Sequence, residues 1–92
     1  MPEVVVYMKR TCLYSRQAMD LLNEKNCEFQ KVDVGADEAR HEEMMRRCGS
    51  QTVPQIFIEG RHIGGCDDLF DLEARGELDA LLGRAARDSA AP

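Results

Sequence analysis

The N-terminal third of the chain has the pattern of a strand, a helix and a second strand in close succession. Residues 4–8 form a nearly continuous apolar run rich in valine, which is typical of a strand covered on both faces. Residues 14–25 place apolar side chains three or four positions apart, as on one face of a helix. Residues 28–34 alternate in character, which indicates a second strand. This succession predicts a βαβ unit whose two strands are parallel.

Cys12 lies where the first of these strands ends and the helix begins. Backbone N–H groups without partners and the positive end of the helix dipole gather at such a position, and both stabilise a thiolate. Lowering a thiol pKa by ~3 units requires about 4 kcal/mol, whereas a helix terminus supplies ~0.3–2 kcal/mol. Hydrogen bonds to the sulfur and the charge of Lys9 would have to supply the rest. These residues leave two interpretations open, a reactive thiolate or a small buried cysteine at a strand–helix junction.

The remainder of the chain contributes a second helix, a hairpin and C-terminal helices. In order, the expected elements are a helix over 39–47, a hairpin with strands 56–58 and 61–63, a helix from Cys66 to Gly76, a helix over 77–87 and a disordered tail over 88–92. Glu59-Gly60 between two β runs is the hairpin signal, and Gly49 is suited to ending the second helix. The whole order predicts a mixed four-stranded sheet flanked by helices on both faces, which is the thioredoxin-like α/β fold.

Length and charge narrow the class of function. A chain of 92 residues is expected to form one domain spanning residues 1–92. Its net charge of −5 argues against general binding to nucleic acid or to an anionic membrane. No apolar run approaches the ~20 residues of a membrane span, and no signal-peptide pattern is present, so we expect a cytoplasmic, reducing location. There, four cysteines without a Cys-x-x-Cys pair indicate neither a disulfide scaffold nor a zinc site.

Three stretches carry motifs that are weak alone and specific in combination. They are Tyr7-x-Lys9-x-x-Cys12-x-Tyr14, Thr52-Val53-Pro54-Gln55-Ile56-Phe57-Ile58 and His62-Ile63-Gly64-Gly65-Cys66-Asp67-Asp68-Leu69. In this order and at this spacing they resemble the glutaredoxins, most closely the small bacterial glutaredoxin 3 type, over residues 4–82. The resemblance implies a glutathione-dependent thiol–disulfide oxidoreductase with Cys12 as its catalytic nucleophile. It also implies a cis peptide bond before Pro54.

The resemblance further implies where glutathione binds. Lys9 would hold the glycyl carboxylate, and the N–H groups of Cys66 and Asp67, at a helix start, would hold the γ-glutamyl carboxylate. The backbone of Val53 would pair with the tripeptide as an added strand, and Tyr14 would flank the sulfur. Taken singly, these residues also fit ordinary structural roles: a solvated lysine, an N-capping aspartate and a core tyrosine. The complete set expected at the glutathione site is Lys9, Tyr14, Gln51, Thr52, Val53, Pro54, Gly65, Cys66 and Asp67.

The active stretch departs from the usual Cys-Pro-Tyr-Cys of the family, because it is Cys12-Leu13-Tyr14-Ser15. Ser15 cannot act as a resolving thiol, since its hydroxyl has no accessible anion at neutral pH. A monothiol route needs only Cys12, which attacks the glutathione sulfur of a mixed disulfide and is regenerated by a second glutathione. We therefore expect monothiol reduction of protein–glutathione mixed disulfides. Cys66 is the nearest candidate for a substitute resolving thiol, and its alternative role is that of a partly buried, inert cysteine.

The missing proline at position 13 supports a second hypothesis. Glutaredoxin relatives without that proline often hold a [2Fe–2S] cluster between two subunits, with two glutathione molecules as further ligands. Cys12 would then be the metal ligand, and the protein a homodimeric cluster carrier or sensor rather than a monomer. A third hypothesis, a non-catalytic thioredoxin-like binding module, is disfavoured because Cys12, Lys9 and Asp67 are all present. The expected partners are glutathione and glutathionylated proteins, with neither nucleic acid nor a membrane.

Overall fold

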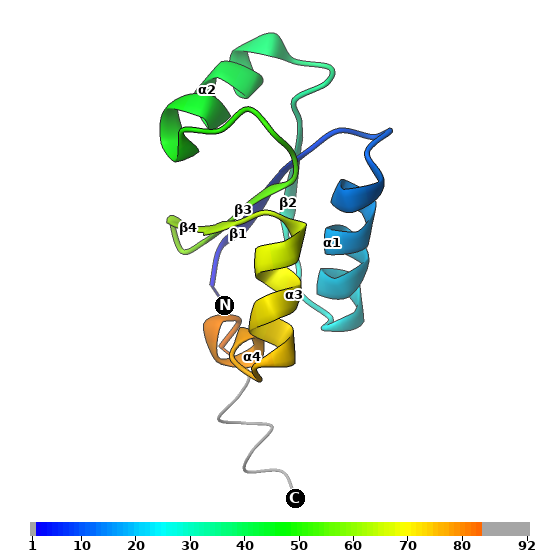
Figure 1. Cartoon of the computed structure of the whole chain (residues 1–92). Helices are drawn as coiled ribbons and strands as arrows, with labels where there is room; N and C mark the ends of the chain where they lie inside the picture. Colours follow the sequence, from blue (N-terminus) through cyan, green and yellow to red (C-terminus); the bar gives the residue numbers. More distant parts are fainter. Residues whose placement is uncertain (1, 84–92) are drawn as a thin grey trace, which may run out of the picture.

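A mixed sheet of four strands forms the centre of the structure, a computed structural model in which residues 2–83 are described (Figure 1). Along the chain the elements are β1 (Val4–Met8), α1 (Leu13–Glu24), β2 (Gln30–Asp33), α2 (Glu38–Cys48), β3 (Gln55–Ile58), β4 (Arg61–Gly64), α3 (Cys66–Ala74) and α4 (Leu78–Leu81). The helix expected over 77–87 thus begins as α4, and its remainder lies, with the tail of 88–92, outside the described residues. Within residues 2–83, no helix has the length and apolar character needed to span a lipid bilayer.

The strand order in the sheet is β2-β1-β3-β4. Strands β1 and β2 are parallel, as the βαβ pattern predicted, and β3 runs antiparallel to both β1 and β4. The hairpin turns at Glu59 and Gly60, whose φ angles of 53° and 76° are typical of a tight two-residue turn. Strand β2 is shorter than the expected run of 28–34, because its pairing with β1 covers only Gln30–Asp33.

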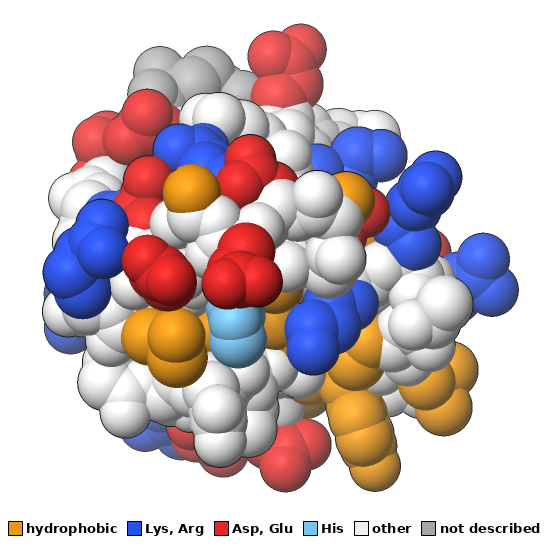
Figure 2. Space-filling model, turned by 90° about the horizontal axis from the view of Figure 1, so that it is seen from above, with side chains coloured by type: hydrophobic (Ala, Val, Ile, Leu, Met, Phe, Trp, Pro, Cys, Tyr) orange, Lys and Arg blue, Asp and Glu red, His pale blue; other side chains and the backbone are white. Residues whose placement is uncertain are grey.

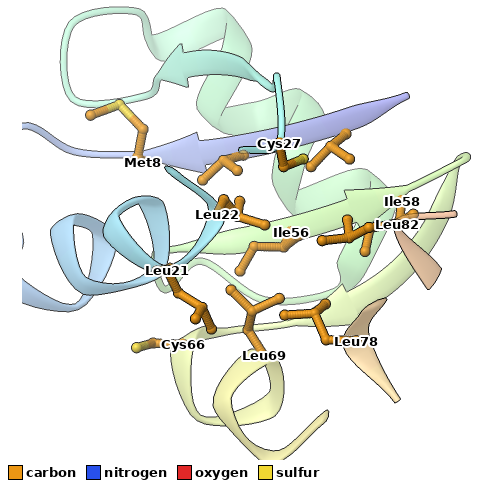
Figure 3. Close-up of a cluster of buried hydrophobic side chains, with 13 residues drawn as sticks. Met8, Leu21, Leu22, Cys27, Ile56, Ile58, Cys66, Leu69, Leu78 and Leu82 are labelled. Atoms are coloured by element: carbon orange, nitrogen blue, oxygen red, sulfur yellow. The ribbon is translucent and has the colours of Figure 1, made fainter. Parts of the chain in front are cut away.

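Helices cover both faces of the sheet, which confirms the predicted thioredoxin-like fold. Helices α1 and α3 lie on one face and α2 on the other (Figure 1). The larger core cluster fills the α1–α3 side, where side chains from β1, β3 and the helices meet (Figure 3). Its fully buried members include Leu22, Ile56, Leu69 and Leu78. A smaller cluster under α2 contains Tyr7, Val32, Val34, Met44 and Phe57.

Helix α2 is anchored to the sheet through the buried side chain of Tyr7. The Tyr7 hydroxyl donates to the Glu43 carboxylate at 2.5 Å and accepts from Nη1 of Arg47 at 2.7 Å. The same guanidinium lies 4.0 Å from the ring centroid of Phe57, within the range of a cation–π contact. The helix ends at Gly49, which takes the expected left-handed conformation with φ 73°. These contacts fix the point from which the chain enters the segment before β3.

Candidate active site

Cys12 is the residue immediately before α1, and its sulfur caps that helix. The N–H of Ser15 donates to Sγ at 3.4 Å, in the manner of an N-cap side chain. On its other side the Cys12 thiol donates to the carbonyl oxygen of Val53, with Sγ and O 3.7 Å apart. The side chain is a free thiol and only partly buried. The interpretation of Cys12 as a buried structural cysteine is therefore wrong.

The pKa of the Cys12 thiol is lowered from its usual value. Partial burial disfavours the thiolate, but the hydroxyl and N–H of Ser15, the N–H of Tyr14 and the charge of Lys9 together outweigh it. The helix-start N–H groups and Lys9 are the contributions that the sequence indicated. The Ser15 hydroxyl is an additional one, and this side chain is fully buried, with Oγ accepting from the N–H of Lys9 at 3.4 Å. Ser15 therefore helps to stabilise the thiolate beside it.

A cis peptide bond joins Val53 and Pro54, as the resemblance implied. Pro54 is buried and Val53 is partly buried, so their backbone forms the wall that faces Cys12 through the Val53 carbonyl. The turn before them is held together by hydrogen bonds of one serine, Ser50, and one threonine, Thr52. The Oγ atoms of Ser50 and Thr52 lie 2.9 Å apart, and the N–H of Thr52 donates to Oγ of Ser50 at 3.2 Å. Polar contacts thus hold the chain that precedes the cis bond.

The opposite wall is the turn from β4 into α3. Gly64 has φ 125°, a conformation that favours glycine, and a β-carbon there would collide with the Asp68 carboxylate. That carboxylate accepts the N–H of Gly65, the N-cap of α3, at 3.0 Å. A β-carbon on Gly65 would lie 3.3 Å from the carbonyl oxygen of Pro54. Gly65 therefore permits the two walls to approach each other through backbone.

Between the two walls lies an open hollow of ≈ 350 Å³. It is lined by Tyr14, Thr52, Val53, Pro54, Gln55, His62, Gly64, Gly65, Cys66, Asp67 and Asp68. Of the residues predicted for the glutathione site, the hollow brings together Tyr14, Thr52, Val53, Pro54, Gly65, Cys66 and Asp67. Lys9 and Gln51 are outside this lining. Lys9 nevertheless acts on Cys12 through its charge, whereas the Gln51 carbonyl oxygen lies 3.2 Å from Nε2 of His41.

Three polar residues of the hollow, Gln55, His62 and Asp68, were missing from the predicted set. For Gln55 a signal was present. The available signal was a polar glutamine in the otherwise apolar run of β3, at a position that proves to be buried. The alternative role of Tyr14 as a core residue is wrong, because its side chain is 58% exposed. An exposed aromatic ring next to Cys12 is free to contact a bound molecule.

Cys66 lies at the margin of the larger core cluster, at the start of α3 (Figure 3). Burial raises the pKa of its thiol, and the negative charges of Asp67 and of the Cys12 thiolate add to the effect. Its Sγ lies 3.9 Å from the amide oxygen of Gln17 on α1. A thiol in this environment is a poor nucleophile, which agrees with the interpretation of Cys66 as an inert cysteine.

A bridging [2Fe–2S] cluster needs four ligands, and the geometry here offers one. Within residues 2–83, no group of three or more histidine, cysteine, aspartate or glutamate side chains is arranged to hold a metal ion. Cys12 suits a thiolate–iron bond, so one chain would supply one ligand. Leu13 and Tyr14 beside it are 62% and 58% exposed, an apolar surface that a second copy could cover. Among residues 2–83 the site therefore does not fit a cluster held by a single chain, and two copies would supply two of the four ligands.

The surface of the molecule seen from above carries acidic and basic side chains interspersed, with hydrophobic side chains projecting at one edge (Figure 2). No single sign of charge dominates this face.

The fold and the site define a class of protein. A thioredoxin-like sheet that presents one acidic cysteine thiol at a helix start, beside a cis-proline turn, is the arrangement of a thiol–disulfide oxidoreductase. The chain belongs to the glutaredoxin family, whose family model matches residues 4–63.

Known relatives agree with this assignment. The chain is 51% identical to glutaredoxin 3 of Escherichia coli over 82 residues, which cover 89% of this chain and 99% of that protein. It is 46% identical to a glutaredoxin of Pseudomonas aeruginosa, over 89% of this chain and 98% of that one. The solution structure of a Brucella melitensis glutaredoxin superposes with a TM-score of 0.79 at 45% identity, over 89% of each chain. A buckwheat glutaredoxin–glutathione complex gives a TM-score of 0.83 at 27% identity, over 92% of this chain and 80% of that one.

Proposed function

We propose that the protein reduces protein–glutathione mixed disulfides by a monothiol mechanism, with Cys12 as the nucleophile. The observation that supports this most is the lowered pKa of a partly exposed Cys12 thiol beside a hollow of ≈ 350 Å³. Ser15 occupies the position of a second thiol and instead favours the Cys12 thiolate. Glutathionylated proteins are the proposed substrates, and glutathione in a reducing cytoplasm is the proposed reductant.

Glutathione is proposed to occupy the hollow because that molecule was part of the similar buckwheat complex. Its backbone would pair with Val53, and its γ-glutamyl carboxylate would accept from the N–H groups at the start of α3, where Cys66 and Asp67 line the hollow. The Asp67 carboxylate would accept from the γ-glutamyl ammonium. Lys9, outside the hollow itself, would attract the glycyl carboxylate.

The proposed reaction is two successive thiol–disulfide exchanges. The Cys12 thiolate attacks the glutathione sulfur, and the S–S bond between that sulfur and the protein's cysteine sulfur breaks. The Cys12–glutathione disulfide forms, and the protein leaves as a thiolate that takes up a proton. A second glutathione, as its thiolate, attacks the glutathione sulfur of that intermediate. Oxidised glutathione leaves, and the Cys12 thiolate is regenerated. Each turnover thus consumes one free glutathione, and the oxidised glutathione that leaves contains that molecule and the glutathionyl group of the substrate.

The proposal is tested by turnover of a glutathionylated peptide in the presence of glutathione, glutathione reductase and NADPH. The wild-type chain should consume NADPH well above a Cys12→Ser control. In a second arm, Ser15→Cys should retain turnover, because the monothiol route does not require a thiol at position 15. Equal rates for wild type and Cys12→Ser would reject the function, and a wild-type intermediate trapped as a Cys12–Cys66 disulfide would reject its monothiol form.

The exposed Leu13 and Tyr14 beside Cys12 favour a second candidate function, a homodimer that carries a [2Fe–2S] cluster between its subunits. Cys12 and glutathione would supply the ligands. Anaerobic reconstitution with iron, sulfide and glutathione should give a coloured dimer on gel filtration. Leu13→Pro restores the usual proline at the first position of α1, where proline is tolerated, and should reduce the yield of that dimer. A colourless monomer from the wild-type chain would reject this candidate.

A further inference from the structure

The hollow contains a buried amide that the proposed chemistry does not use. Gln55 begins β3, directly after the cis-proline turn, and its side chain is only 5% exposed. With Ser15 it is one of two polar residues that are buried among residues 2–83. A buried amide without partners destabilises a fold by ~1–3 kcal/mol. Its hydrogen bonds therefore identify what it holds in place.

The Gln55 amide bridges two segments of the hollow. Its Nε2 donates to the carbonyl oxygen of Thr52 at 3.0 Å and contacts Oγ1 of the same threonine at 3.3 Å. Its Oε1 lies 2.7 Å from Nε2 of His62 on β4. Because a carbonyl oxygen can only accept, the Thr52 carbonyl requires the amide nitrogen of Gln55 on its side. The amide oxygen then faces His62, so the imidazole Nε2 must carry the proton and donate.

The imidazole of His62 is itself held in orientation by the sheet. Its ring lies against Phe57, with centroids 5.0 Å apart and planes inclined by 37°. Phe57 is buried, and it is paired with His62 across the β3–β4 ladder next to a register shift. The position of the imidazole Nε2 is thus set by packing that does not involve any bound molecule.

We propose that Gln55 and His62 are positioning residues that fix the width and orientation of the glutathione hollow, an inference that rests on the proposed function. Thr52 precedes Val53, whose backbone is proposed to pair with the tripeptide, and β4 leads into the Gly64-Gly65 wall. The amide of Gln55 therefore ties the turn on one side of the hollow to the strand that carries the other side. A turn that is already in place binds a peptide more tightly, because less chain has to be ordered on binding.

This role predicts a specific pattern in binding and kinetics. Gln55→Met keeps the volume and removes both sets of hydrogen bonds, and it should weaken binding of S-methylglutathione, measured by calorimetry, about five-fold or more. The KM for the glutathionylated peptide should rise by a similar factor, while kcat and the pH profile of Cys12 alkylation stay as in the wild type. Gln30→Met, the same substitution on the exposed edge strand β2, is the matched control and should change neither.

A pair of variants at the exposed His62 separates positioning from folding. His62→Phe keeps a ring against Phe57 and removes the donor, so it should weaken S-methylglutathione binding about three-fold. His62→Gln supplies an amide N–H near the place of the imidazole Nε2 and should restore binding to within about two-fold of the wild type. This pair decides the question alone if Gln55→Met does not fold.

The outcomes of the two arms are distinct. If the wild-type chain binds S-methylglutathione and turns over the peptide, either of two results would overturn the positioning role. One is unchanged binding in Gln55→Met, and the other is equal binding in the two His62 variants. A parallel fall of kcat and alkylation in Gln55→Met would overturn it as well, since a general structural defect acts on both. Failure of the wild-type chain to bind S-methylglutathione or to turn over the peptide would instead reject the proposed function.

Discussion

Two helices border the hollow, and a cysteine lies at or just before the first residue of each, but the two thiols differ in acidity. Cys12 precedes α1 as its N-cap and accepts an N–H from that helix, and its pKa is lowered. Cys66 is the first residue inside α3, whose N-cap is Gly65, and its pKa is raised by burial and by the negative charges of Asp67 and Cys12. The positive end of a helix is present in both cases.

The comparison shows that a helix start does not by itself produce a reactive thiol. The N-cap side chain folds back over the N–H groups of the first turn and accepts from them. A side chain one position later begins beyond those groups, and that of Cys66 joins the core cluster instead. A difference of one residue in the register of the helix therefore separates a candidate nucleophile from a core residue.

The largest predicted contrast is in turnover. Cys12→Ser should lower turnover of a glutathionylated peptide at least about 1,000-fold, because serine cannot form the mixed disulfide. Cys66→Ser keeps the backbone N–H at the start of α3, and it should lower turnover less than about three-fold. The NADPH-coupled assay on both variants gives this ratio directly. A loss of similar size in the two variants would mean that Cys66 takes part in the chemistry and that the contrast is wrong.

The next contrast concerns stability. Aspartate is among the best N-cap residues, so Cys12→Asp should leave the free energy of unfolding within about 0.5 kcal/mol of the wild type. Cys66→Asp buries a charge in the core cluster beside Asp67, and should lower that free energy by about 2–4 kcal/mol. Urea denaturation followed by circular dichroism measures both. Equal destabilisation by the two substitutions would show that the two helix starts are not different environments.

A smaller effect is expected from the hydroxyl that supports Cys12. Ser15→Ala removes a group that favours the thiolate, so the pKa of Cys12 should rise towards its usual value. Alkylation of Cys12 by iodoacetamide at pH 7 should slow about two- to five-fold, while that of Cys66 in the same molecule stays the same. Peptide mass spectrometry resolves the two sites. An unchanged Cys12 rate would assign the lowered pKa to the backbone and to Lys9 alone.

The smallest effect is expected at the Lys9 side chain, whose charge lowers the pKa of the Cys12 thiol. Lys9→Gln should slow alkylation of Cys12 at pH 7 less than about two-fold at 0.15 M salt, where charges ~8 Å apart are already screened. The difference between Lys9→Gln and the wild type should shrink further as salt is added. A difference that does not depend on salt would indicate a direct hydrogen bond from Lys9 to the sulfur.

Much of the fold could be predicted from the sequence, because local patterns determine it. The valine run of β1, the turn at Glu59-Gly60 and the left-handed Gly49 are each specified by the residues themselves. The ends of β2 could not be predicted, because they depend on which residues find partners on β1. The family resemblance supplied the cis bond at Pro54, which no local pattern indicates.

The site was predictable where the motifs are continuous and not where it depends on pairing across the sheet. Cys12 and the turn at Pro54 are recognisable in sequence. The turn lines the hollow, and the Cys12 thiol contacts the carbonyl of Val53, one of the lining residues. The contact between Gln55 and His62 depends on the register of the β3–β4 hairpin, which contains a shift between Ile56 and Phe57. Sequence periodicity does not reveal such a shift.

The pH dependence of alkylation at Cys12 and Cys66 tests the central claim most directly. A thiolate reacts and a thiol does not, so the rate at each site rises with pH and levels off above the pKa of that site. We predict that Cys12 reaches half of its maximal rate at a pH below that of an unfolded cysteine, and Cys66 at a pH above it. A Cys12 midpoint at or above that of the unfolded reference would contradict the account, whatever the result at Cys66.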